Sequence, residues 1–222
     1  MQHTQLSYDL AHLIGATMLM AGFALLYQRR IYAVLNTFAF QALALAAAAA
    51  WQAHVQNAPH LYATAAIALV FKAILVPAAL HWLVDKLGIH RTVETALSIN
   101  WTMITGVALV ALSILLVLPV TANAAALTRE SLAVAMSIVL LGMLMMITRR
   151  NAVTQVVGFM ALENGLLLAA VSAKGMPLVV EISIAFSVLV AMTLFGIFFF
   201  RIRERFDTLD LHYLETYRGE RH

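Results

Sequence analysis

Two ionisable side chains, Lys72 and Glu163, stand in the middle of long apolar stretches of the sequence. A charge at that depth in a membrane costs roughly 2.5 to 3.5 kcal/mol on insertion scales, so it needs a partner or a water-filled cavity. The stem of Lys72 is too short to carry its charge to either membrane surface. Both residues are therefore candidates for a proton relay. The alternatives are a structural ion pair or a neutral packing residue for Lys72, and a helix–helix hydrogen bond for Glu163.

Weaker polar candidates accompany this pair. Asn164 adds a hydrogen-bonding amide beside Glu163. Glu181 follows Pro177 early in the last apolar stretch, where it is either the exit of a relay or an acid at the membrane surface. Three further amides could solvate a chain of water molecules or simply bind helices together: Asn36, Gln41 and Asn100. Two histidines in apolar stretches, His12 and His81, are expected to be packed and hydrogen-bonded rather than proton carriers.

The composition excludes several other kinds of chemistry. The chain has no cysteine, so it cannot hold an iron–sulfur cluster or zinc on thiolates and cannot form a disulfide. Its eight histidines show no HxxxH or HExxH spacing, and the sequence has no glycine-rich phosphate loop. We therefore expect no bound cofactor or metal, no catalytic residue, and any redox chemistry in a partner. The net charge is only +3 and the bases lie at the ends of the apolar segments, a placement that membrane orientation explains better than nucleic-acid binding.

Long apolar runs must position these residues. Of the 222 residues, 63% are hydrophobic and only 11% are charged, too few to cover a water-soluble protein. Seven runs are long enough to cross a membrane as helices, and their short connections make neighbouring helices antiparallel. The predicted fold class is therefore all-α, a polytopic bundle of seven transmembrane helices. The runs cover about residues 8–27, 31–54, 61–84, 95–119, 130–148, 152–173 and 178–200.

The basic residues predict the orientation of this bundle. Apart from Lys72, only Arg129 and Lys174 fall on one side of the predicted membrane. Cytoplasmic loops carry an excess of Lys and Arg, so the other side should be cytoplasmic, with the N-terminus outside and the C-terminus inside. The bases on that cytoplasmic side are Arg29, Arg30, Lys86, Arg91, Arg149, Arg150, Arg201, Arg203, Arg205, Arg218 and Arg221.

Two divisions of the chain are predicted. The transmembrane domain covers residues 1–205, and a cytoplasmic tail covers 206–222. Paired arginines precede both the second and the sixth run, which suggests that the three helices of residues 129–205 repeat those of 1–93 around a linker helix within 94–128. Two alanine-rich helices can also look alike by accident.

The tail carries an apolar stripe at helical spacing, which predicts a short cytoplasmic helix. It holds more acidic than basic residues, so it is not a polybasic lipid-binding segment. The helix is expected to dock a peripheral subunit, and the alternative is that it lies on the membrane surface. The stripe consists of Phe206, Leu209, Tyr213 and Tyr217.

Residues 130–205 resemble a known type of membrane subunit. The arginine pair followed by a helix with Gly158, Glu163 and Asn164 is similar to the three-helix K-type subunit of respiratory complex I and the C-type subunit of multisubunit cation antiporters. Over most of its length, the chain resembles the hydrogenase-4 component E family. The features that carry this second resemblance are the four additional N-terminal runs, the LENG segment that begins at Leu162, and the FRIRERF segment that begins at Phe200.

The resemblance implies a non-catalytic subunit of the bacterial inner (plasma) membrane. Such a subunit lies among antiporter-like and other membrane subunits of a complex I-related hydrogenase and contributes to proton translocation coupled to electron transfer. The implied partners are those subunits, a peripheral module docked by the tail, and membrane lipids.

The carry-over of residues from that family is incomplete. The first buried glutamate of the small subunit would fall at Met160, and Glu163 stands one turn later on nearly the same face. The second would fall near Val188, where this chain has no acid, and Glu181 is two turns away. Lys72 could supply the missing charge.

A stand-alone secondary transporter with a 3+1+3 helix plan is the alternative function. It matches the predicted number of spans and their orientation. The chain has only four prolines, however, which leaves little of the broken-helix structure that often forms a substrate site at the midplane.

Overall fold

The fold is taken from a computed structural model, which describes residues 2–87 and 95–173 of the chain. These residues form helices only, apart from one isolated bridge between Thr95 and Arg149. The helices are α1 (Gln2–Tyr27), α2 (Ile31–Gln56), α3 (Pro59–Ile67), the π-helix η1 (Ala68–Leu75), α4 (Val76–Leu87), α5 (Ile99–Val120), α6 (Ala126–Thr148) and α7 (Ala152–Ser172).

Six helical stretches within the described residues are long and apolar enough to cross a membrane, and together they indicate a multi-pass membrane protein. They correspond to the first six predicted runs. The fourth was predicted to begin at residue 95, whereas α5 begins at Ile99, because Thr95 forms an isolated bridge with Arg149 and the backbone of the N-cap residue Ser98 is extended. The seventh predicted run, Glu181 and the tail lie outside the described residues.

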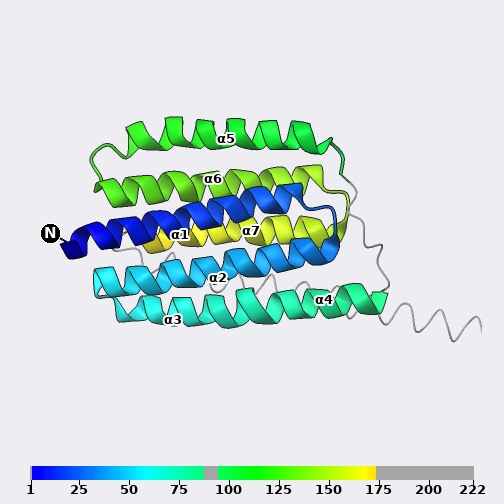
Figure 1. Ribbon diagram of the computed structural model, residues 1–222, viewed down its shortest axis with the longest axis horizontal. Helices are drawn as coiled ribbons and strands as arrows, with labels where there is room; N and C mark the ends of the chain where they lie inside the picture. The colour runs from blue at the N-terminus through cyan, green and yellow to red at the C-terminus, as the bar shows by residue number, and fades with distance from the viewer. Residues whose placement is uncertain (1, 88–94, 174–222) are drawn as a thin grey trace, which may run out of the picture. The chain divides into compact units, whose positions relative to one another are not determined.

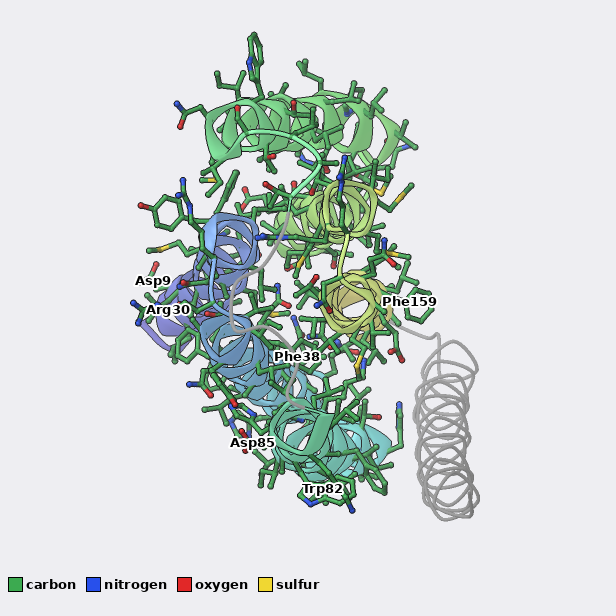
Figure 2. All side chains as sticks on the ribbon, turned by 90° about the vertical axis from the view of Figure 1, so that its right-hand side faces the viewer. Asp9, Arg30, Phe38, Trp82, Asp85 and Phe159 are labelled. Carbon is green, nitrogen blue, oxygen red and sulfur yellow. The ribbon has the colours of Figure 1, made fainter. Side chains whose placement is uncertain are left out.

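Four helices, α1, α2, α6 and α7, pack around a shared interior (Figure 1). Helix α1 contacts both α2 and α6, and α7 contacts both α6 and α2. Helix α5 packs on α6, and the α3–η1–α4 stretch packs on α2. Figure 2 shows Phe38 turned into this interior, where it is fully buried, and Trp82 on the periphery, where it is half exposed. Side chains that point into the shared interior are therefore buried, whereas those on the periphery stay exposed.

Glycines bring α6 and α7 into close contact. A Cβ atom on Gly165 would lie 2.8 Å from the carbonyl oxygen of Ala135, and one on Gly142 would lie 2.5 Å from the backbone nitrogen of Leu162. Such small residues let membrane helices approach until their backbones touch. Gly158 also lies against α6, where a Cβ atom would be 3.0 Å from the backbone nitrogen of Met146.

The third membrane-crossing stretch changes its helical geometry around Lys72. Residues Pro59–Leu87 run through α3, η1 and α4 without a break, but η1 is a π-helix in which the N–H of Val76 donates to the carbonyl of Phe71, five residues earlier. Pro77 follows at once and has no N–H to donate, which weakens the regular α-helical pattern there. Within η1 only Ala68 and Lys72 are buried. The π-helix therefore presents one charged side chain to the interior, a placement common at functional sites.

Candidate functional site

Lys72 and Glu163 form an ion pair inside the bundle. The Nζ atom of Lys72 lies 3.3 Å from Oε2 of Glu163, and the two side chains are only 3% and 1% exposed. The same Nζ donates a hydrogen bond of 3.1 Å to Oδ1 of Asn164. The sequence placed both charges at mid-membrane and left open whether they meet. In the structure the two charges do meet, although Lys72 on η1 and Asn164, the neighbour of Glu163 on α7, are 92 positions apart in the sequence.

Two amides extend this pair toward α1. The Nδ2 atom of Asn164 donates to Oε1 of Gln41 at 3.4 Å, and Nε2 of Gln41 donates to the backbone carbonyl of Met18 at 3.3 Å. Asn164 and Gln41 are both completely buried. We call Lys72, Glu163, Asn164 and Gln41 the buried network. It links η1, α7, α2 and α1, and all four of its residues were candidates from the sequence.

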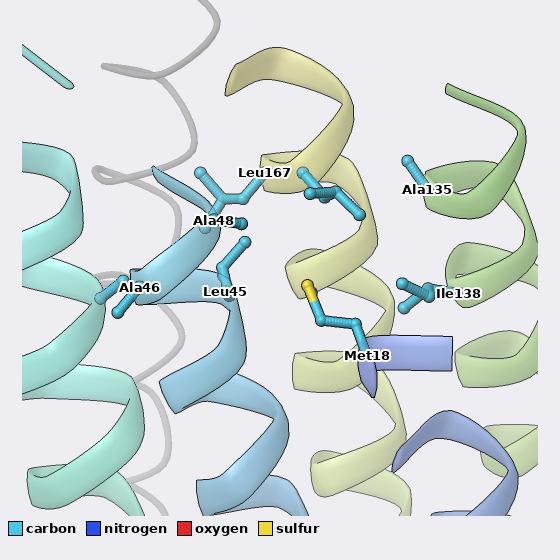
Figure 3. Packing of buried hydrophobic residues seen from close by; sticks show 9 residues of the cluster. Met18, Leu45, Ala46, Ala48, Ala135, Ile138 and Leu167 are labelled. Atoms are coloured by element: carbon cyan, nitrogen blue, oxygen red, sulfur yellow. The ribbon is translucent and has the colours of Figure 1, made fainter. Parts of the chain in front are cut away.

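The helices hold the network in an apolar setting. Gln41 stands on α2 between the buried Phe38 and Leu45, and Glu163 stands on α7 beside the buried Met160. On one side of the network lies a cluster of buried apolar side chains, which we call the apolar layer (Figure 3). Its members are Met18, Leu45, Ala46, Ala48, Ala68, Ala135, Ile138, Leu167 and Leu168.

This arrangement gives the network a definite proton chemistry. In an interior of low dielectric, an isolated charge is strongly disfavoured, but an ion pair and the corresponding neutral pair both have zero net charge. The ammonium of Lys72 is the donor and the carboxylate of Glu163 the acceptor, so a proton can move between them without creating net charge. The amide of Asn164 can continue to accept from Nζ during that transfer.

The structure does not bring every predicted residue to this site. Asn36 lies five positions before Gln41 on α2, which turns it to a different face of a 3.6-residue helix, and its side chain is exposed. Asn100 is exposed in the first turn of α5, a helix that packs only along one side. Neither residue joins the buried network, so the structure gives no support to the prediction that they assist a relay there.

Arg149 is a second buried cation, and the sequence did not predict its burial. Arg149 is 1% exposed, and its Nη2 atom donates to the carbonyls of Leu25, Leu26 and Gln28 at 2.9, 2.7 and 2.9 Å. The first two carbonyls belong to the last turn of α1 and the third to the turn that follows it, and a cation at this end of a helix is favoured by the helix dipole. Burial lowers the pKa of Arg149 from its usual value, but an arginine stays protonated in proteins.

Connections between helices that carry basic residues meet at one end of the bundle. Arg149 contacts the α1–α2 turn, and Thr95 pairs with Arg149, so three of the predicted cytoplasmic connections lie together. Near this end, Tyr32 hydrogen-bonds Asp85, and the Nζ of Lys86 lies over the ring of Trp82. The opposite end holds Gln56, which donates to the carbonyl of Val171. This grouping is what the positive-inside prediction requires, while the orientation itself stays a prediction.

Comparison with known proteins gives one relative of comparable length. The uncharacterized protein Rv0085 of Mycobacterium tuberculosis is 29% identical over 211 residues, which make up 90% of this chain and 92% of that protein. The likeness thus extends along nearly the whole of both chains. No family model matches the chain. No solved structure matches it either.

Proposed function

We propose that this chain is a non-catalytic subunit of the bacterial plasma membrane, part of a hydrogenase-4-like complex related to complex I, and that its buried network moves protons in step with electron transfer. The observation that carries the proposal is the Lys72–Glu163 ion pair, joined to two amides inside apolar helices. The membership of the complex rests on the resemblance of the sequence to hydrogenase-4 component E and to the small complex I subunit.

Stability alone is a poor reason for such a pair. Two charges lose more solvation on burial than their attraction usually returns, and well-packed apolar residues in their place are often as stable or more stable. Ionisable residues inside membrane proteins instead mark the paths of ions and protons. The π-helical geometry at Lys72 and the fully buried amides support a site built for those two groups.

One cycle of the pair can pass one proton. A proton that reaches the carboxylate of Glu163 leaves the ammonium of Lys72 as a buried cation without its counter-charge, which favours loss of a proton from Nζ. Transfer of the remaining proton from Glu163 to Lys72 then restores the ion pair. The charge balance returns to its starting state, and one proton has moved from the donor side to the acceptor side. Conformational change elsewhere in a complex would decide which side is open at each step.

Gentle-detergent purification of the tagged full chain from its native membrane tests membership of the complex. Large antiporter-like chains and a metal-bearing hydrogenase module should co-purify in fixed proportion. A chain that purifies alone as a homo-oligomer and transports a solute in proteoliposomes would contradict the proposal and favour the stand-alone transporter. The matched control is the same preparation after the membrane has been dispersed in a harsh detergent, which should release the partners and leave the tagged chain.

A further inference from the structure

A small cavity opens at the end of the bundle where the N-terminus lies in Figure 1, between α1, α2, α6 and α7. This is the end that the basic residues predict to be outside. The space open to the centres of water molecules is about 40 Å³. A single water needs roughly 10 to 15 Å³ of such space, so the cavity has room for about three. Its polar lining consists of His12, Gln52, Glu130, Ser131 and Ser172, and we call it the outer cavity.

The lining offers the hydrogen bonds that water requires. The Nε2 atom of His12 lies 3.0 Å from Oε2 of Glu130, and both side chains are about half exposed, at 48% and 46%. Ser172, the last residue of α7, is more buried, at 4% exposed, and its Oγ has no hydrogen-bond partner among the residues that the structure describes. A buried hydroxyl without a partner is costly, and a water molecule in the cavity would satisfy it. The outer cavity is therefore polar enough to be filled.

The apolar layer separates this cavity from the buried network. Along α7, Ser172 lines the cavity, Leu168 lines the cavity and belongs to the layer, and Glu163 belongs to the network. Along α2, Gln52, Leu45 and Gln41 follow in the same order. At 1.5 Å per residue, Leu168 and Glu163 are about 7.5 Å apart along the helix axis. Figure 3 shows Met18, Leu45 and Ile138 projecting into the space between the helices at this level.

We propose that the outer cavity holds water and is the outer port through which protons pass between the outside and the buried network, with the apolar layer as its closed gate. A gap of about 7.5 Å would be bridged by roughly two waters at ordinary hydrogen-bond spacing. Apolar constrictions of this kind stop conduction by staying dry and permit it when they become wet. The role of the port rests on the proposed function of the network, whereas the presence of water in the cavity does not.

The absence of cysteine makes the cavity directly testable, because every introduced thiol is the only one in the chain. Ser172→Cys and Ala48→Cys place a thiol on the cavity lining, and Ala48 is at the border where the lining meets the apolar layer. Ala53→Cys is the matched control, because Ala53 is on the same helix as Ala48, is nearer the end of α2, and is buried in a different apolar cluster. If reactivity depended only on distance from the end of α2, Ala53→Cys would react faster. If it depended on contact with the cavity, Ala48→Cys would react faster.

The measurement uses silver ions on right-side-out membrane vesicles, followed by alkylation of the remaining thiols in denaturant. Ser172→Cys and Ala48→Cys should be blocked at least about tenfold faster than Ala53→Cys, since a thiol must be reached by water to ionise and react. In inverted vesicles this advantage should disappear, because Ser172, Ala48 and Ala53 all lie toward the end of the bundle that then faces the vesicle interior. The proposal is overturned if Ala48→Cys reacts no faster than Ala53→Cys, or if the cavity variants react faster from the cytoplasmic side.

A second experiment tests the gate. Leu45→Ser places a hydroxyl in the apolar layer, and we expect it to raise the passive proton leak of proteoliposomes several-fold. Leu61→Ser is the control, because Leu61 is equally buried but belongs to the other apolar cluster. Adding Glu163→Gln to Leu45→Ser should remove the extra leak, and a leak that persists would overturn the connection between port and network. If the cavity labels as expected but Glu163→Gln pumps normally, the proposed function fails and the water-filled cavity stands.

Discussion

Lys72 and Arg149 are both buried cations, but they are neutralised in opposite ways. Arg149 donates to three backbone carbonyls, which are fixed dipoles that cannot take up a proton. Lys72 faces the carboxylate of Glu163 and an amide, so its proton has an acceptor within 3.3 Å. Arginine also holds its proton at any physiological pH, whereas lysine releases it when its surroundings change. Burial of a charge therefore does not identify a relay, and the nature of the partner does.

The largest effect should come from removing the arginine. Arg149→Met leaves three carbonyls at the end of α1 without their donor, and we expect it to lower the free energy of unfolding by about 3 kcal/mol. Proton translocation per surviving molecule should be unchanged. Denaturant unfolding in detergent, with translocation normalised to folded protein, measures both. Arg150→Met, at the exposed neighbouring position, should have little effect. A stable Arg149→Met protein that has lost translocation would abolish the distinction between the two cations.

Exchanging the two kinds of cation sharpens the comparison. Lys72→Arg keeps the positive charge beside Glu163 but removes the ability to release a proton, so coupled translocation should fall by about tenfold or more while assembly is retained. Arg149→Lys should keep translocation and lose part of the stability, since an ammonium lacks the planar fork of a guanidinium. Lys86→Arg, exposed near the end of α4, is the matched control for the chemical change. Full activity of Lys72→Arg would assign Lys72 a purely electrostatic role.

The smallest effect concerns the amides. Gln41→Leu removes the partner of Asn164 and should lower translocation a few-fold, because the remaining groups of the network lose orientation rather than their titratable atoms. Asn36→Leu, five positions earlier on the same helix and exposed, should leave translocation unchanged. Translocation assays on the two variants side by side decide the matter, and equal losses would show that position in the network is irrelevant.

The apolar runs of the sequence were sufficient to predict the six described membrane-crossing helices and to single out the four residues of the network. The six described membrane-crossing helices follow from apolar runs, and Lys72, Glu163, Asn164 and Gln41 were recognisable as polar residues within those runs. Their pairing was not predictable, because it depends on which helices are neighbours. A helix that is apolar on all sides carries no stripe that would indicate its buried face. For this reason Gln41 and Asn36 looked equivalent in the sequence.

Two further contacts depended on the three-dimensional arrangement in the same way. Nothing in the local sequence distinguishes Arg149, which is buried, from Arg150, which is exposed. Gly142 lies among large apolar residues, so its contact with the backbone of α7 was not apparent. Gly158 also lies against α6, so Gly158→Leu should disturb the fold of this chain before it disturbs any complex.

The most direct test of the relay is Glu163→Gln in the complex reconstituted into proteoliposomes. Glutamine keeps the shape and hydrogen bonding of the side chain and removes its titratable group. Acid-driven fluorescence quenching should fall by about tenfold or more while turnover of the redox module is largely kept, and Glu163→Asp should restore part of the quenching. Unchanged quenching in Glu163→Gln would remove the residue from the proton path, and an equal loss of quenching and turnover would show that Glu163 serves the fold instead.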